Sequence, residues 1–479
     1  MYLIRYSSTI FLFLLMLLGG CKPWQKLETA TRTFIRPLPA TFPASSDTAN
    51  VAHVTWKEII KDKGLAALID TAVQNNWNLA IALQRIKAAQ SDIFFSQGVL
   101  RPKVNGLVSS NLRRFGLYTM DGAGNKTTEI YNDRIIPEDL PNYFAGLQAS
   151  WEVDIWGKLQ NQKKAATARY LASIEGKNFI TTNLIAEIAN AYYDLVALDN
   201  MLLITEETIS LQEQALEMIK AQKAAAAANE LAVKQFETHL HNLKGSRLEI
   251  LQEISLNENR INFLLGRYPQ PILRDKTIIN QEQPIKVNIG LPSALLQNRP
   301  DIKQAEYELI ASKADVQAAK AMFFPTLNLN GSVGFQAFKT SLMFQSPESF
   351  AYGLFGDLLF PFLNRSAIKA SFIKANTNQI GALYNYQRVI LTGYLEVYNQ
   401  MLVLKNLQEI YEEKSREVNA VNESTAISTE LFKRGRANYL EVLITQQKAV
   451  QAKIDLVSTK KRQFQTTINL YRALGGGWR

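Results

Sequence analysis

The chain has 479 residues, of which 47% are hydrophobic, and it carries a formal net charge of +10 at pH 7. The hydrophobic fraction is that of a globular protein. The sequence has no apolar run of about 18 residues or more, the length that a membrane-spanning helix needs. Basic residues are interleaved with acidic ones and form no basic stripe, which argues against a nucleic-acid partner. A single cysteine excludes an internal disulfide framework.

The first predicted element is a signal peptide over residues 1–20. Arg5 supplies a positive charge, and residues 11–18 form an apolar run shorter than the roughly 20 residues of a spanning helix. Two glycines then precede Cys21, the only cysteine. This arrangement resembles the lipobox of bacterial lipoproteins, in which the cysteine is acylated and becomes the first mature residue. We therefore expect an exported chain held at a membrane by a covalent N-terminal lipid on Cys21. The alternative is an unpaired thiol within an ordinary signal peptide.

The rest of the chain contains two copies of an internal sequence repeat. Residues 75–92 align without a gap with residues 298–315, and Leu265-Gly266 matches Leu474-Gly475 near the end of each copy. The same order of features in both halves predicts a tandem duplication. The predicted organisation is a lipid-anchored segment (21–64), repeat 1 (65–266), a connector (267–291), repeat 2 (292–475) and a tail (476–479).

Each repeat begins with a predicted helix and continues with strands. The first helix, about residues 65–99, ends before Pro102, and its counterpart ends before Pro325. Apolar and polar residues then alternate, which indicates strands of about 10 to 12 residues. Their length and alternation match transmembrane barrel strands, although a strand on a soluble core shows the same pattern. Four strands cannot close a barrel, which needs about eight, so several chains must contribute. The predicted strands are residues 103–115, 143–155, 326–338 and 350–361.

Two predicted helices are far longer than usual. They run from residue 158 to about 228 and from 365 to about 433, and each would extend about 100 Å. Apolar residues at three- and four-residue steps indicate coiled-coil-like packing. Turns near Ala228-Asn229 and at residues 433–438 return the chain, so both hairpin tips point away from the strands. This pattern predicts a tube that crosses a compartment; the alternative is a lipid-tethered periplasmic coiled-coil protein that forms no channel.

The stretch from Gly290 to Gly334 carries the clearest resemblance to a known family. Its motifs Leu291-Pro292-Ser293, Arg299-Pro300-Asp301 and Phe324-Pro325 resemble those of the TolC-like outer membrane efflux proteins. The best match is the lipoprotein branch that serves RND-type pumps, and the resemblance covers essentially the whole mature chain.

The resemblance implies a fold class that is mainly α with membrane β, internally duplicated. It implies a homotrimer in which twelve strands, four per protomer, form one transmembrane β-barrel in the outer membrane and the helices form an α-helical barrel through the periplasm. The implied function is an exit duct of a tripartite efflux system that passively conducts drugs, toxic compounds or metal ions. The implied partners are outer-membrane lipids, a periplasmic adaptor (membrane fusion) protein and an inner-membrane RND-type transporter. A duct of a type I secretion or ABC-type export system is the alternative.

The family closes its periplasmic end just after the last tip turn. Carried over by position, the residues of this aperture are Leu440, Glu441 and Ile444. Many relatives have an aspartate at the place of Ile444 and often an arginine at that of Gln447, and this chain has neither. Three like charges near a threefold axis raise the pKa of a carboxyl, so we hypothesise an aperture that responds to cations or pH. The alternative is that Glu441 is a solvated helix carboxylate and Ile444 packs between helices.

No sequence pattern indicates catalysis or a bound cofactor. The three histidines are His53, His239 and His241, and the last two do not share a helix face because they are two residues apart. We find neither a metal-binding cluster, a nucleophile–histidine–acid pattern nor a glycine-rich phosphate loop. We therefore expect no enzyme activity, no metal and no cofactor besides the lipid.

Overall fold

A computed structural model of the chain describes residues 37–42, 51–129, 136–275, 289–361 and 365–479. The chain divides into two units, Met1–Pro37 and Leu38–Arg479, and every described helix and strand belongs to the second. Cys21 and the predicted signal peptide lie outside the described residues. In the described part of the chain, none of the helices combines the length and the hydropathy of a membrane span.

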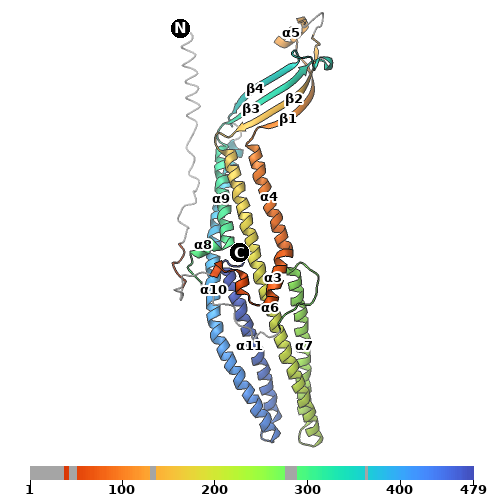
Figure 1. The fold of residues 1–479 in the computed structure, drawn as a ribbon, viewed down its shortest axis with the longest axis vertical. Coiled ribbons are helices and arrows are strands. Elements are labelled where there is room, and N and C mark those ends of the chain that lie inside the picture. Colours follow the sequence, from red (N-terminus) through yellow and green to blue (C-terminus); the bar gives the residue numbers. More distant parts are fainter. Residues whose placement is uncertain (1–36, 43–50, 130–135, 276–288, 362–364) are drawn as a thin grey trace. The chain divides into compact units, whose positions relative to one another are not determined.

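The helices and strands occur in the same order in both halves (Figure 1). In each half, a short helix and a longer one lead into a pair of strands, which is followed by a very long helix and its return helix. The first half additionally has α2 (Trp56–Ile59) and, between its strands, α5 (Met120–Thr127). Its other elements are α3 (Lys63–Asn75), α4 (Trp77–Val99), β1 (Lys103–Arg114), β2 (Asp139–Val153), α6 (Lys158–Ala224) and α7 (Glu230–Leu264). The second half has α8 (Ala294–Asn298), α9 (Pro300–Ala321), β3 (Thr326–Ala337), β4 (Phe350–Leu359), α10 (Arg365–Lys433) and α11 (Tyr439–Ala473).

The four strands form one antiparallel sheet in the order β1-β2-β3-β4. Pairing of β2 with β3 joins the two halves, and it places Gly146 opposite Gly334. A Cβ on either glycine would lie 2.6 Å from the other's Cα, so the close approach of these strands requires glycine on both sides. β2 begins four residues before the predicted residue 143, because its pairing with β1 continues as far as Arg114 opposite Asp139.

The predicted single helix over residues 65–99 is wrong, because the chain breaks it at Asn76 into α3 and α4. The Asn76 side chain caps α4 by accepting hydrogen bonds from the backbone N–H groups of Asn78 and Leu79 at 2.9 and 3.2 Å. Its amide nitrogen donates to the carbonyl of Leu264, 2.8 Å away, at the end of α7. The break is therefore stabilised by a contact 188 residues away along the chain.

The helices pack against one another around a core formed mainly by the middle of α6. α6 contacts α3, α4, α7, α9 and α11, and its residues Ile188, Tyr192 and Leu195 are completely buried. With 67 and 69 residues, α6 and α10 each extend about 100 Å. In Figure 1 the sheet lies at one end of α4, α6 and α9, and the turns of the α6–α7 and α10–α11 hairpins lie at the far ends of the much longer α6 and α10.

Candidate functional site

The two hairpin turns are built alike although their sequences differ. The backbone φ is +59° at Ala226 and +69° at Gly435, which hold corresponding positions. In each turn this residue and the next donate their N–H groups back to the preceding helix, the pattern that commonly ends a helix. Asn229 and Asn438 then cap α7 and α11 with their side-chain oxygens. Both hairpins thus reverse within five residues, and α11 starts directly at the tip.

The three residues predicted to line an aperture lie on the first turns of α11. Leu440 and Ile444 are 43% and 42% exposed, and their four-residue spacing places them on one face. Glu441 is exposed beside them, whereas Val442 and Leu443 are buried. The first turns of α11 therefore bury one face within their own protomer and leave Leu440, Glu441 and Ile444 outside it.

Glu441 makes no ion pair with any residue that the structure describes. Its backbone N–H donates to the Asn438 carbonyl at 3.1 Å, within the cap of α11. A carboxylate without a partner on an exposed helix face is available to cations in solution, or to a group on another chain.

An apolar cluster holds the start of α11 against the first hairpin. Leu216, Ile219, Val233 and Phe236 of α6 and α7 are buried, and Phe432 and Tyr439 of the second hairpin pack on them. The rings of Phe236 and Tyr439 lie 6.5 Å apart. Beside this contact is a cavity of about 420 Å³ lined by both hairpin turns. The position of Leu440, Glu441 and Ile444 therefore depends on how the two tips pack.

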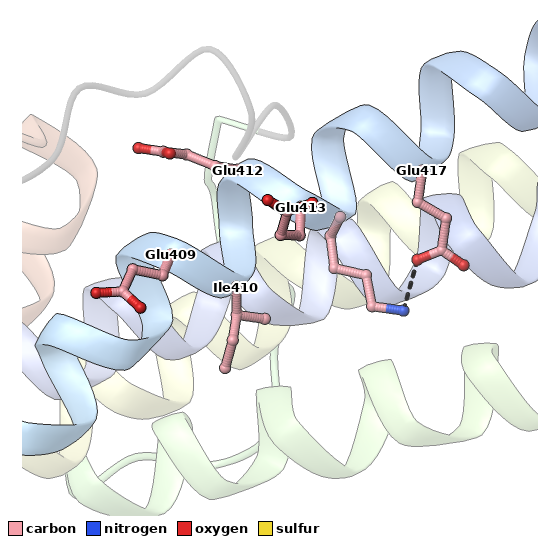
Figure 2. Close-up of a pocket in the computed structure, with 6 residues that line it drawn as sticks. Glu409, Ile410, Glu412, Glu413 and Glu417 are labelled. Carbon is pink, nitrogen blue, oxygen red and sulfur yellow. Dashed lines mark ion pairs between the residues drawn. The ribbon is translucent and has the colours of Figure 1, made fainter.

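On α10, before its tip, four glutamates, Ile410 and Lys414 line an open hollow of about 450 Å³. Figure 2 shows these side chains on one stretch of the helix. Lys414 pairs with Glu417 at 2.8 Å and with Asp455 of α11 at 2.9 Å. The hydrogen bond from Lys414 lowers the pKa of the Asp455 carboxyl. The surface stays predominantly negative because one lysine faces several carboxylates. No sequence motif had marked this surface. The four glutamates are Glu409, Glu412, Glu413 and Glu417.

Arg299, like Asn76, is a polar residue whose role in folding no sequence pattern had indicated. It is 4% exposed and occupies the position in repeat 2 that Asn76 occupies in repeat 1. Its guanidinium donates to the carbonyl of Ala473 at 2.7 Å, just as Asn76 donates to that of Leu264. It also binds both oxygens of Asp301 at 2.7 and 3.0 Å and Glu396 of α10 at 2.8 Å. Burial by itself would lower the pKa of Arg299, but the hydrogen bonds and charges of the two carboxylates outweigh it and raise the pKa.

No metal-binding cluster of three or more His, Cys, Asp or Glu side chains occurs within the described ranges. His239 lies near the interface with the second hairpin and is partly buried, whereas His241, two residues farther along α7, is exposed. The two imidazoles therefore do not converge on a common site.

Comparison with known proteins identifies relatives along almost the whole chain. The family model described as outer membrane efflux protein matches residues 68–267 and 291–476. The solvent efflux pump outer membrane protein SrpC of Pseudomonas putida is 26% identical over 481 residues, covering 98% of this chain and 97% of SrpC. The cation efflux system protein CusC of Escherichia coli is 25% identical over 449 residues, covering 92% and 93% of the two chains.

Solved structures share the fold. A membrane protein from Pseudomonas aeruginosa superposes with a TM-score of 0.83 at 26% identity, covering 93% of this chain and 97% of that one. A structure of CusC superposes with a TM-score of 0.81 at 23% identity, covering 96% and 100%. The duplicated arrangement of strands and long helical hairpins is thus the fold of these outer-membrane channels.

Proposed function

The chain belongs to the outer membrane efflux protein family, and we propose that it is the exit duct of a tripartite efflux system, located in the outer membrane and extending into the periplasm. The observation that carries this function is one four-stranded sheet at one end of helices that extend about 100 Å. The sheet suits a membrane and the helices suit a path across the periplasm. The chain conducts passively and is not an enzyme.

The proposed assembly is a homotrimer. Among the described residues, β1 and β4 each pair with one strand only, which leaves two open edges on the sheet. Open edges invite pairing with another chain, and four strands are too few to close a barrel. Three copies supply twelve strands, with β4 of one protomer beside β1 of the next. Exposed apolar side chains on the edge strands suit contact with outer-membrane lipids; they are Val104, Val108, Leu112, Leu354 and Leu358.

The other proposed partners are a periplasmic adaptor protein and an inner-membrane RND-type transporter. Both follow from the role of an outer-membrane component in a tripartite pump, and the relatives are named for solvent and cation efflux. The proposed cargo is accordingly drugs, toxic compounds or metal ions. No cofactor is proposed besides the covalent lipid on Cys21, which would anchor the mature N-terminus to the outer membrane.

Native mass spectrometry of detergent-extracted protein tests the assembly. We expect a mass of three protomers, each without residues 1–20 and with acyl chains on Cys21. The Cys21→Ala variant is the matched control, and it should lose the acyl mass. A lipidated monomer would overturn the duct and favour the tethered coiled-coil alternative, whereas an unlipidated trimer would overturn the anchor alone.

We also propose that Leu440, Glu441 and Ile444 line the periplasmic aperture around the threefold axis. Their exposure on one side of α11 supports this, because residues at a constriction must lie outside the protomer's own core. Single-channel conductance of Glu441→Gln tests the electrostatic role, and we expect reduced cation selectivity. Glu249→Gln, which changes an exposed glutamate of α7, is the control. Unchanged selectivity and open probability in Glu441→Gln would refute the role of the charge.

A further inference from the structure

A polar contact joins the two hairpins beyond the apolar cluster at their tips. The Nδ1 atom of His239 on α7 lies 3.4 Å from the side-chain nitrogen of Gln447 on α11. An amide NH₂ can only donate, so His239 Nδ1 must be the acceptor and the ring proton must lie on Nε2. With the Gln447 amide in this orientation, the contact uses the neutral imidazole.

The surroundings of this contact are poor in hydrogen-bond partners. The Nε2 atom of His239 is buried and has no partner among the described residues. The side-chain oxygens of Gln235, one turn earlier on α7, and of Gln446, next to Gln447, are likewise buried without a partner there. This region between α7 and α11, called the polar seam below, therefore has few satisfied hydrogen bonds. It is easily opened, because little hydrogen-bond energy is lost when its groups meet water.

Charge on this seam would be unfavourable. Burial lowers the pKa of His239, and no carboxylate in the described part of the chain pairs with its ring to offset that. Carboxylates on the neighbouring helices are engaged elsewhere or exposed: Glu237 pairs with Lys234, and Glu213 with Lys244. Other charged or titratable groups on these helices are Glu217 of α6, which pairs with Lys220, His241 of α7, Glu423 of α10, and Glu441 and Lys448 of α11.

We propose that His239 and Gln447 form a proton-sensitive latch between α7 and α11, and that protonation of His239 releases the second hairpin from the first. A protonated imidazole donates from both nitrogens, so it can no longer accept from the Gln447 NH₂. It could keep the contact only if the amide turned its oxygen toward Nδ1, and the charge on the partly buried ring would still favour exposure to water. Release would move the first turns of α11, which carry Leu440, Glu441 and Ile444. The role of the latch at an aperture rests on the proposed function, whereas the latch itself depends only on these two helices.

The direction of the pH effect follows from linkage. The packed state holds His239 with a lowered pKa, and the released state exposes it with an ordinary pKa of about 6.5. The released state therefore binds protons more readily, and it gains as pH falls through this value. Lowering the pH from about 7.5 to about 5.5 favours release by at most about tenfold per protomer, which is the limit for a packed ring that stays neutral.

A fluorophore between the two tips can measure release. Ala227 of the first hairpin turn and Phe432 at the end of α10 line the same cavity, and Lys433 follows Phe432 at an exposed position. A bimane on Ala227→Cys would be quenched by the tryptophan of Lys433→Trp while the tips are packed. The described native tryptophans lie outside both turns. Protein without Ala227→Cys gives the background from any free Cys21.

In the full-length protein, bimane fluorescence should rise as pH falls from about 7.5 to about 5.5. His239→Gln, which is neutral at both pH values, should abolish the rise, and the control His241→Gln should retain it. The absence of a rise in the parent, or an equal rise in His239→Gln, would overturn the latch. Conductance of the same protein at neutral pH separates the two proposals: a conducting trimer without the pH-dependent rise refutes the latch alone. A pH-dependent rise that His239→Gln abolishes in a protein that never conducts supports the latch and refutes the duct.

Discussion

Replacing Arg299 by methionine should be one of the most destabilising single changes in this chain. Arg299, the residue before α9, is 4% exposed, and its guanidinium joins three segments: Asp301 on α9, Glu396 on α10 and the carbonyl of Ala473 at the end of α11. Gly393 of α10 allows this crossing, because a Cβ there would lie 3.0 Å from the arginine's Nε. Methionine fills much of the volume but leaves two carboxylates and a carbonyl without their donor.

The magnitude depends on the groups that remain after the substitution. Breaking a buried ion pair by removing one partner costs about 3–5 kcal/mol, because the other charge stays buried and unpaired. Asp301 is 17% exposed and keeps a hydrogen bond from the N–H of Ile302, whereas Glu396 is 36% exposed and can turn to water. We therefore expect a loss of about 3 kcal/mol in the free energy of unfolding, at the lower end of that range.

Unfolding of the detergent-solubilised protein in guanidinium chloride, monitored by tryptophan fluorescence, measures this loss. Trp478 is a nearby reporter, since its indole nitrogen donates to the carbonyl of Gly475 at 3.0 Å. Arg416→Met is the matched control: that arginine is 71% exposed and pairs only at the surface with Glu413, so the change should stay within about 0.5 kcal/mol. A loss below about 1 kcal/mol in Arg299→Met would refute the stabilising role of this residue at the junction.

Two further predictions concern the first hairpin turn and the alkaline limit of stability. Ala226→Gly should stabilise the turn by about 1 kcal/mol because φ is +59° at this residue. Ala225→Gly, where φ is −82°, should instead destabilise the turn. Hydrogen exchange of the turn measures both effects, and equal effects would contradict this prediction. Burial raises the pKa of Tyr471 to about 12, so the stability that its neutral form contributes is present below pH 10 and is lost as pH rises from about 10 to 12. Tyr471→Phe should reduce this alkaline loss of stability. Near neutral pH it should lower the free energy of unfolding by about 1 kcal/mol, because the hydrogen bond to the Val54 carbonyl is lost. Unfolding measured at both pH values tests this, and an unchanged alkaline loss would contradict it.

The duplication, the strands and the long helices could be predicted from the sequence because their signals are local. Alternation of apolar and polar residues at period 2 and their recurrence at period 3.6 depend on side chains a few positions apart. The turns were predictable for the same reason, since Asn229 and Asn438 are ordinary helix caps. The family followed from motifs such as Arg299-Pro300-Asp301, whose residues are consecutive in the chain.

The contacts of Asn76 and Arg299 were not predictable in this way. Local signals for the breaks existed, because asparagine is a favoured helix N-cap and Pro300, which aligns with Trp77, begins α9, but the prediction of one helix over residues 65–99 did not use them. Each break depends on a carbonyl at the end of its own repeat, Leu264 for Asn76 and Ala473 for Arg299. The boundaries of the anchored segment and the acylation of Cys21 stay predictions.

By itself, the sequence determined the duplicated architecture, the family and the positions of the hairpin tips. Only the tertiary structure decided which face of α11 lies outside the protomer, that His239 meets Gln447 and that Lys414 of α10 pairs with Asp455 of α11. The physical reason is the range of the interactions. Periodicity and capping act within a few residues, whereas the packing of one hairpin on the other joins residues about 200 positions apart.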